Sequence, residues 1–297
     1  MVTARMMARH RRAAVLCRQA GRTGAALLAA VVTLTGCRDR AGEASGRPTS
    51  DAAVSVASRE IRKVDFANLE WFDSTFGSTV KLVDGSAWHA AGNDTGGWQW
   101  NLLGRPQFAD VDGDGHEDAV AGLASSGDMA MGQAWYVWLW RDGRAQQLRV
   151  PVVASTRCDR RIESVTAVPH GFEVQAFLFV DGDSCAGGGS VPITYVVGVR
   201  DGWPVRLRPQ YGPLDTCDPG KLTVALHPQG KPVLYTSPDV RSPTVEPAAH
   251  YDALLVDEYA ADPALSPELD WVLGIAVSGD RRVCGWARAD QVRGAWH

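Results

Sequence analysis

The sequence feature that most restricts the fold of this chain is a series of short β-favouring stretches separated by Asp-Gly or His-Gly pairs. The pairs are Asp84-Gly85, Asp142-Gly143, His170-Gly171 and Asp201-Gly202. Such pairs adopt the positive φ angles that tight hairpin turns need, and strong helical periodicity is absent. We therefore expect a mainly β fold of antiparallel strands. The predicted strands include 79–83, 119–123, 133–140, 162–168, 173–180 and 194–199.

One predicted strand, 133–140, is apolar on both faces. Because side chains alternate along a strand, one face carries Trp135, Val137 and Leu139, and the other carries Tyr136, Trp138 and Trp140. A strand of this kind belongs in the middle of a packed structure. Its tryptophans have two interpretations, as ligand platforms or as core. The core is favoured, because aromatic side chains dominate β cores.

The first 36 residues have three parts in the order of an export signal. Residues 1–22 contain six arginines and no acid, residues 25–32 are apolar, and Leu34-Thr35-Gly36-Cys37 follows. The apolar run is shorter than the roughly 20 residues of a transmembrane helix, which is typical of a cleavable signal. The last four residues resemble the bacterial lipobox, which implies a mature chain that begins at Cys37 and carries lipid (palmitate) there. An ordinary secretory signal with an incidental cysteine is the alternative.

Export sets the expected charge and location of the mature chain. Removal of residues 1–36 leaves 24 basic and 34 acidic side chains, a formal charge of −10. A nucleic-acid partner is therefore not expected, since affinity for phosphate backbones comes mainly from clustered Lys and Arg. The expected location is the bacterial cell envelope, extracytoplasmic and attached to a membrane by the lipid. Arg38 at the second position resembles lipoproteins of the outer membrane in a diderm source; in a monoderm the protein would lie outside the plasma membrane.

Composition and prolines divide the remaining chain. Residues 37–60 are rich in small and charged residues, contain no aromatic side chain, and are expected to form a flexible tether. The folded part is long enough for two domains. A stretch with several prolines, 204–219, is the best boundary. We predict an antiparallel β domain over 61–213 and a second domain over 216–297.

The cysteines that remain after export indicate disulfides. They are Cys158, Cys185, Cys217 and Cys284, an even number in an oxidising compartment. Three pairings are possible, and Cys158 with Cys185 and Cys217 with Cys284 is favoured because each pair lies within or closes one predicted segment. One bridge with two free thiols is the alternative. Zinc is not expected, because no two cysteines have the short spacing of zinc sites.

Carboxylates crowd one short segment between two predicted strands. Asp110, Asp112, Asp114 and Asp118 occupy positions 1, 3, 5 and 9 of a loop. Like charges at this density repel one another, whereas Ca²⁺ takes six to eight oxygen ligands. The spacing therefore predicts a calcium site. Gly115 would permit the sharp turn, and the main-chain carbonyl of His116 would be a further ligand, with its imidazole pointing away.

The loop resembles one known type of calcium site more than another. An EF-hand needs Glu at position 12, where this chain has Ala121, and the flanks 108–111 and 119–123 look like strands. Residues 107–148 resemble an FG-GAP or VCBS repeat. Because the resemblance occurs once and a propeller needs several blades, it implies a hairpin clamped by structural Ca²⁺ in another β fold. A solvated Asp-Gly turn without an ion, and a catalytic metal, are the alternatives.

Four segments near the C-terminus resemble a bacterial SH3-like domain: 231–243, 251–259, 271–275 and 285–292. The resemblance implies a small barrel that binds cell-wall (peptidoglycan) peptide or an envelope protein. Its candidate contacts are Tyr235, Trp271 and Trp286. Barrel core is nevertheless the favoured place for Trp271 and Trp286, which leaves Tyr235 as the better surface candidate. The insertion 260–270 is longer than the family usually has.

The common motifs of catalysis are missing from the sequence. It contains no Gly-x-Ser-x-Gly, no phosphate loop and no paired histidines with zinc spacing. The leading hypothesis is therefore a non-catalytic, membrane-anchored envelope lipoprotein that acts as a binding module. The alternatives are a lipid-anchored extracytoplasmic hydrolase with a calcium-braced active site, and a structural partner in an envelope complex.

Overall fold

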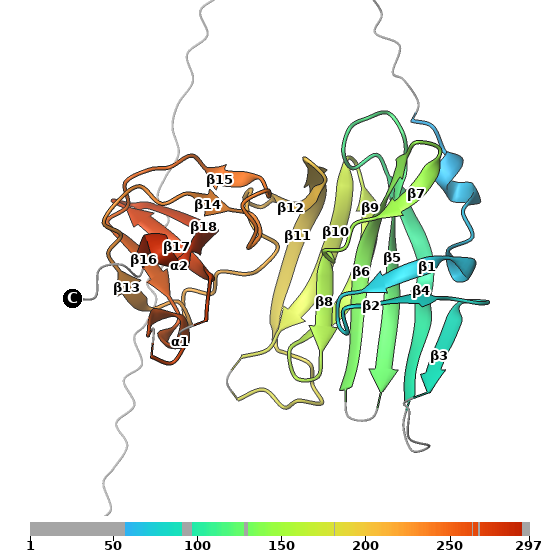
Figure 1. The fold of residues 1–297 in the computed structure, drawn as a ribbon, viewed down its shortest axis with the longest axis horizontal. Coiled ribbons are helices and arrows are strands. Elements are labelled where there is room, and N and C mark those ends of the chain that lie inside the picture. The colour runs from blue at the N-terminus through green and yellow to red at the C-terminus, as the bar shows by residue number, and fades with distance from the viewer. Residues whose placement is uncertain are drawn as a thin grey trace, which may run out of the picture. The chain divides into compact units, whose positions relative to one another are not determined.

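The computed structural model describes residues 57–90, 97–127, 130–180, 182–262, 264–266 and 268–292. The predicted signal peptide, Cys37 and most of the predicted tether lie outside these ranges. The fold is mainly β, as predicted, and its sheets are built from antiparallel strand pairs (Figure 1). None of the described helices is long and apolar enough to cross a membrane.

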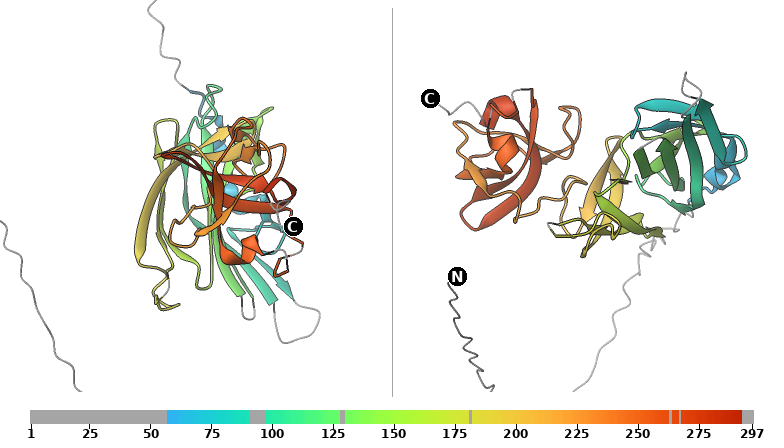
Figure 2. Two further views of the ribbon diagram at one scale, coloured as in Figure 1. Left: turned by 90° about the vertical axis from the view of Figure 1, so that its left-hand side faces the viewer. Right: turned by 90° about the horizontal axis from the view of Figure 1, so that it is seen from below.

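The first sheet has six strands, and a hairpin and two short helices accompany it. Its strand order is β3-β4-β5-β6-β7, with β8 paired to β6. The sheet curves, so that its strands follow an arc when seen from below (Figure 2). Its strands are β3 (Ser86–Ala90), β4 (Gly97–Ala109), β5 (Asp118–Gly127), β6 (Ala130–Arg141), β7 (Arg144–Gln147) and β8 (Val153–Thr156). The preceding elements are η1 (Glu60–Lys63), η2 (Phe66–Asn68), β1 (Glu70–Asp73) and β2 (Ser78–Lys81).

A second, four-stranded sheet shares a core with the first. Its order is β12-β11-β10-β9, and its strands are β9 (Arg160–Val168), β10 (Gly171–Leu178), β11 (Val191–Arg200) and β12 (Trp203–Arg208). Val137 and Leu139 of β6 belong to one buried cluster with Val165 and Val174 of this sheet. The apolar faces of the two sheets are therefore buried against each other.

Strand β6 is apolar on both sides, as the sequence predicts. Trp135, Val137 and Leu139 face the core shared with the second sheet. Tyr136, Trp138 and Trp140 face a different cluster, which contains residues of η1, η2, β1 and β4. In that cluster the rings of Trp71 and Trp138 lie 4.8 Å apart in an edge arrangement. The core interpretation of these tryptophans is confirmed.

The predicted turn pairs lie where the chain reverses direction. Asp84, Asp142, His170 and Asp201 all have positive φ angles between 50° and 59°. The last three link β6 to β7, β9 to β10 and β11 to β12. Few residues other than Gly, Asn, Asp and His adopt this conformation readily, so these pairs mark the hairpins correctly.

The third sheet contains the C-terminal strands. Its order is β13-β16-β17-β18-β14-β15. The strands are β13 (Val224–Leu226), β14 (Leu234–Tyr235), β15 (Thr244–Glu246), β16 (Ala253–Val256), β17 (Trp271–Ser278) and β18 (Arg281–Arg288), with short helices α1 (Glu258–Ala261) and α2 (Ala289–Val292). Its buried core draws on residues from 224 onward, whereas the other two cores use residues up to Leu214. The described residues nevertheless belong to one compact unit, so the domain boundary near 213–216 stays a prediction.

Both favoured disulfides are present. Cys158 is bonded to Cys185 with their Cα atoms 4.5 Å apart, and Cys217 is bonded to Cys284 with Cα atoms 5.8 Å apart. The first joins the segment before β9 to the loop before β11, and the second joins the segment before β13 to β18.

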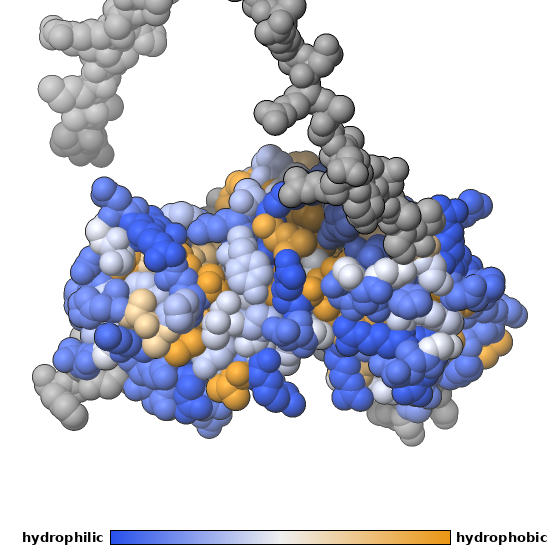
Figure 3. Space-filling view, turned by 90° about the horizontal axis from the view of Figure 1, so that it is seen from above, coloured by the Kyte–Doolittle hydropathy of each residue, from blue (hydrophilic) through white to orange (hydrophobic). Residues whose placement is uncertain are grey.

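Hydrophilic residues cover most of the face in Figure 3, and hydrophobic ones show between them in small areas.

The end of the predicted tether differs from expectation, because residue 60 is already inside η1. Ser58 also donates its backbone N–H to the carbonyl of Gly115, 2.9 Å away. Ser58 and Glu60 thus already belong to the fold, since Ser58 bonds the acidic loop and Glu60 begins η1.

Candidate metal centre

The acidic loop connects two neighbouring strands of the first sheet. It leaves β4 after Ala109 and enters β5 at Asp118, and the flanking strands pair with Ala109 opposite Asp118. Gly113 and Gly115 have φ angles of 80° and 85°, which favour glycine because it lacks a Cβ. The predicted hairpin, and the sharp turn at Gly115, are therefore present.

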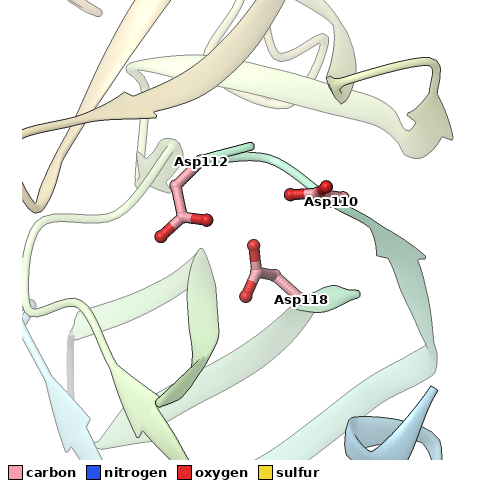
Figure 4. Close-up of side chains that lie close together, drawn as sticks. All are labelled: Asp110, Asp112 and Asp118. Carbon is pink, nitrogen blue, oxygen red and sulfur yellow. The ribbon is translucent and has the colours of Figure 1, made fainter. Parts of the chain in front are cut away.

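Backbone amides of the loop hold its carboxylates in place. Asp110 Oδ1 accepts from Gly113 N at 2.8 Å, and its Oδ2 accepts from Gly115 N at 3.2 Å. Asp112 Oδ1 accepts from Asp114 N at 3.3 Å. These bonds coil the chain tightly and hold the carboxylates of Asp110 and Asp112 on the inside of the loop (Figure 4).

Asp118 is the buried member of the group. It is 0% exposed, and its two oxygens accept from Trp140 N at 2.9 Å and from Val111 N at 3.1 Å. Burial raises the pKa of Asp118 to about 7, the two backbone bonds oppose this, and the carboxylates of Asp112 and Asp114 raise it further. A buried carboxylate with like charges beside it is stabilised by a cation.

Three carboxylates converge on one space. Asp110, Asp112 and Asp118 each offer an oxygen, and these oxygens all lie within 4.8 Å of one another. Figure 4 shows the three side chains directed toward the space between them. Two ligands of one Ca²⁺ ion, each about 2.3–2.6 Å from it, lie at most about 5 Å apart. Oxygen ligands at this separation fit a hard divalent cation.

One predicted carboxylate ligand, Asp114, is not in this group. The carboxylate of Asp114 accepts from His116 N at 2.8 Å instead, and the described cluster contains neither Asp114 nor the His116 ring. The His116 imidazole is not one of the predicted ligands. The role of the His116 main-chain carbonyl as a ligand stays a prediction. Three carboxylates leave several positions for carbonyl or water ligands, and a cavity of about 220 Å³ beside Asp110 and Asp112 offers room for water.

Arg141 is a neighbour that sequence reasoning missed. Its guanidinium Nη2 donates to Asp112 Oδ2 at 2.7 Å, from a side chain that is 41% exposed. The contact exists because Trp140, which bonds Asp118, places the end of β6 beside the loop. No spacing within the loop itself signals this residue. Arg141 neutralises part of the local charge and competes with a cation for Asp112.

Replacement of Arg141 by Gln is expected to make Ca²⁺ bind about three- to tenfold more tightly, because a repelling and competing cation is removed. Titration calorimetry on the chelated protein measures the change. The matched control is Arg144→Gln on the neighbouring strand β7, an exposed residue, which should leave the affinity unchanged. Weaker binding in Arg141→Gln would mean that the guanidinium is needed to hold Asp112 in place.

The outer surface of the loop is tied to the start of the folded chain. Glu117 N donates to the carbonyl of Ser58 at 2.7 Å, and the Glu117 carboxylate forms ion pairs with Arg59 and Arg62. These contacts tie the end of the loop to the segment that leads into η1. The loop is thus part of the packing between β4, β5 and η1, which favours a structural role for a bound ion.

Comparisons with known protein families, with curated proteins and with solved structures found no match to this chain. The resemblances of residues 107–148 to FG-GAP and VCBS repeats, and of the C-terminal segments to SH3-like domains, therefore stay predictions.

The three predicted contact residues of the C-terminal part lie together on one face of its sheet. Tyr235 is opposite Trp286 in the pairing of β14 with β18. The rings of Tyr235 and Trp271 are 5.4 Å apart, edge to face. Trp286 Nε1 donates to Asp215 Oδ2 at 3.2 Å. We call this group the aromatic face.

The core interpretation of Trp271 and Trp286 is wrong. The buried cluster of this sheet takes Val272, Val283 and Ala287 from the same strands, and these alternate with the two tryptophans. Trp271 and Trp286 are only half-buried, as is Tyr235. The cause is the period of two along a strand: Val272, Val283 and Ala287 face the core, so Trp271 and Trp286 face the other side of the sheet.

Proposed function

We propose that this protein is a lipid-anchored, extracytoplasmic lipoprotein of the bacterial envelope that acts as a non-catalytic binding module. The acidic loop would hold a structural Ca²⁺ ion, and the aromatic face would bind cell-wall peptide or an envelope protein. The single observation that carries the proposal is the gathering of Tyr235, Trp271 and Trp286 on the outer face of one sheet.

Aromatic side chains outside a core suit a binding role. Large rings give much contact area with little loss of conformational entropy, which is why they are enriched where proteins bind partners. Trp286 is fixed by Asp215, and Tyr235 is fixed by its contact with Trp271. Such preorganisation reduces the entropic cost of binding.

The calcium part of the proposal rests on the acidic loop. Asp110, Asp112 and Asp118 provide hard oxygen ligands at a separation that fits one ion. The loop is braced by backbone bonds from β6 and from Ser58. An ion held in this way would stabilise the junction of β4 and β5.

Replacement of Tyr235 by Ala is expected to reduce retention of the full chain on purified peptidoglycan at least about tenfold, as for a central interface residue. Sedimentation of the protein with peptidoglycan measures retention. The matched control is Tyr259→Ala, an exposed tyrosine of α1, which should be retained like the wild type. Failure of the wild type to sediment, with or without Ca²⁺, would count against cell-wall binding.

A further inference from the structure

Another sheet face carries a set of polar side chains beside an exposed tryptophan. In the first sheet, Trp98 and Trp100 of β4 point into the cluster around Trp71, so Gln99 between them points to the opposite face. Trp88 is opposite Gln99, Gln99 is opposite Ser126, and Ser126 is opposite Met131. These four residues form one row across β3, β4, β5 and β6.

The next row along the strands continues the pattern. Asn101 is opposite Ala124, Ala124 is opposite Gln133, and Gln133 is opposite Ser155 of β8. Strands lie about 4.8 Å apart, so the first row spans roughly 14 Å from Trp88 to Met131. We call these two rows the polar face. Its width suits an extended ligand better than a single small ring.

Trp88 is both exposed and fixed. Its side chain is 66% exposed, an unusual value for a tryptophan. A Cβ atom at Gly97 would collide with the six-membered ring of Trp88, so the indole lies close against the backbone of β4 where glycine leaves room. The ring is therefore a preformed flat platform on the sheet.

A cavity adjoins the polar face. It has a volume of about 380 Å³, and its lining includes Ser126, Gln133, Ser155 and Arg157, together with the disulfide between Cys158 and Cys185. Cavities of this size bind small organic groups. Arg160 also lines it and lies 3.4 Å from the carboxylate of Asp159.

The side chains of the polar face define the chemistry of a ligand. Gln99, Asn101, Ser126 and Gln133 are uncharged, and each both donates and accepts hydrogen bonds. Among these four side chains, the structure describes one hydrogen bond, which Gln99 Nε2 donates to Asn101 Oδ1 at the long distance of 3.4 Å. Hydroxyl groups of a sugar have the same dual character, and the C–H face of a pyranose ring can lie flat on an indole. The two rows offer no charge to an ionic ligand.

We propose that the polar face binds a neutral oligosaccharide. One pyranose stacks on Trp88, and the following units lie across β4, β5 and β6, with hydroxyls bonded by Gln99, Ser126 and Gln133. The cavity beside Ser155 accepts a substituent or the end unit. This site is separate from the aromatic face of the third sheet and does not depend on it.

The test is calorimetric titration of the purified full chain with four neutral hexasaccharides: cellohexaose, chitohexaose, mannohexaose and maltohexaose. At least one is expected to bind. Trp88→Ala should weaken that binding at least about tenfold, which corresponds to 1.4 kcal/mol, and Gln133→Ala should weaken it several-fold. Because Trp88 is mostly exposed, the Trp88→Ala variant should keep the melting temperature of the wild type.

Tyr259→Ala is the matched control, because it removes an exposed aromatic ring from α1, which belongs neither to the polar face nor to the aromatic face. It should bind the hexasaccharide like the wild type. The proposal is overturned by absence of heat with all four sugars, by unchanged binding in Trp88→Ala, or by equal loss in Trp88→Ala and Tyr259→Ala. Binding to phosphatidylcholine vesicles that Trp88→Ala abolishes, without sugar binding, would identify a lipid-contacting surface and would also overturn it.

Discussion

Chelation of Ca²⁺ is expected to lower the melting temperature by about 5–10 °C, and addition of about 1 mM Ca²⁺ to restore it. A ligand present at about 100 times its dissociation constant stabilises the folded state by about 2.7 kcal/mol. For a chain of this size each 1 kcal/mol shifts the melting temperature by about 2–4 °C. Differential scanning calorimetry with and without chelator measures the shift.

The physical reason lies in Asp118 and its two neighbours. Asp118 is fully buried and shares one space with Asp110 and Asp112. Without a divalent ion, ionised carboxylates in this space repel one another and are poorly solvated. A cation that binds only the folded loop removes this cost and leaves the unfolded chain unaffected.

Two variants of the same loop separate a calcium site from a general charge effect. Asp112→Asn should weaken Ca²⁺ binding at least about 30-fold and remove most of the thermal shift, because it takes away a clustered carboxylate. The Arg141 side chain that contacts Asp112 is 41% exposed, so its guanidinium can turn into solvent in this variant. Asp114→Asn is the matched control, since Asp114 bonds His116 N and is outside the cluster. Equal losses in both variants would contradict the three-residue site.

Local patterns in the sequence predicted the parts of the fold that local physics determines. Asp142 and His170 mark turns because few other residues adopt positive φ angles readily. Strand β6 could be placed in the centre because both of its faces are apolar, and the structure buries both. The disulfide between Cys158 and Cys185 follows from pairing within one segment.

Features that depend on packing between distant segments could not be predicted in the same way. Trp271 and Trp286 alternate with the core residues of their strands, and only the packing of the third sheet decides which face is buried. Arg141 reaches Asp112 because β6 passes the acidic loop, a contact across 29 residues of sequence. Trp88 has no local signal of exposure, since its exposure depends on the position of β3 at the edge of the sheet.

The double variant Cys217→Ser/Cys284→Ser is expected to lose about 4 kcal/mol of unfolding free energy, the largest loss of stability among these variants. The bridge closes a segment with a sequence separation of 67 residues, and its loss frees the unfolded chain. Urea unfolding followed by circular dichroism measures the loss. Cys158→Ser/Cys185→Ser, with a separation of 27 residues, should lose slightly less, since the entropic term grows only with the logarithm of loop length.

The two double variants should differ much more in binding than in stability. Cys217 lies two residues from Asp215, whose carboxylate accepts from Trp286 Nε1, and Cys284 lies two residues from Trp286 on the same strand face. The bridge therefore holds Asp215 against the aromatic face. Below its melting temperature, Cys217→Ser/Cys284→Ser should lose peptidoglycan retention several-fold, whereas Cys158→Ser/Cys185→Ser should keep it. Equal retention by both folded variants would show that the aromatic face does not depend on this bridge, because its own packing would then suffice to position Trp286.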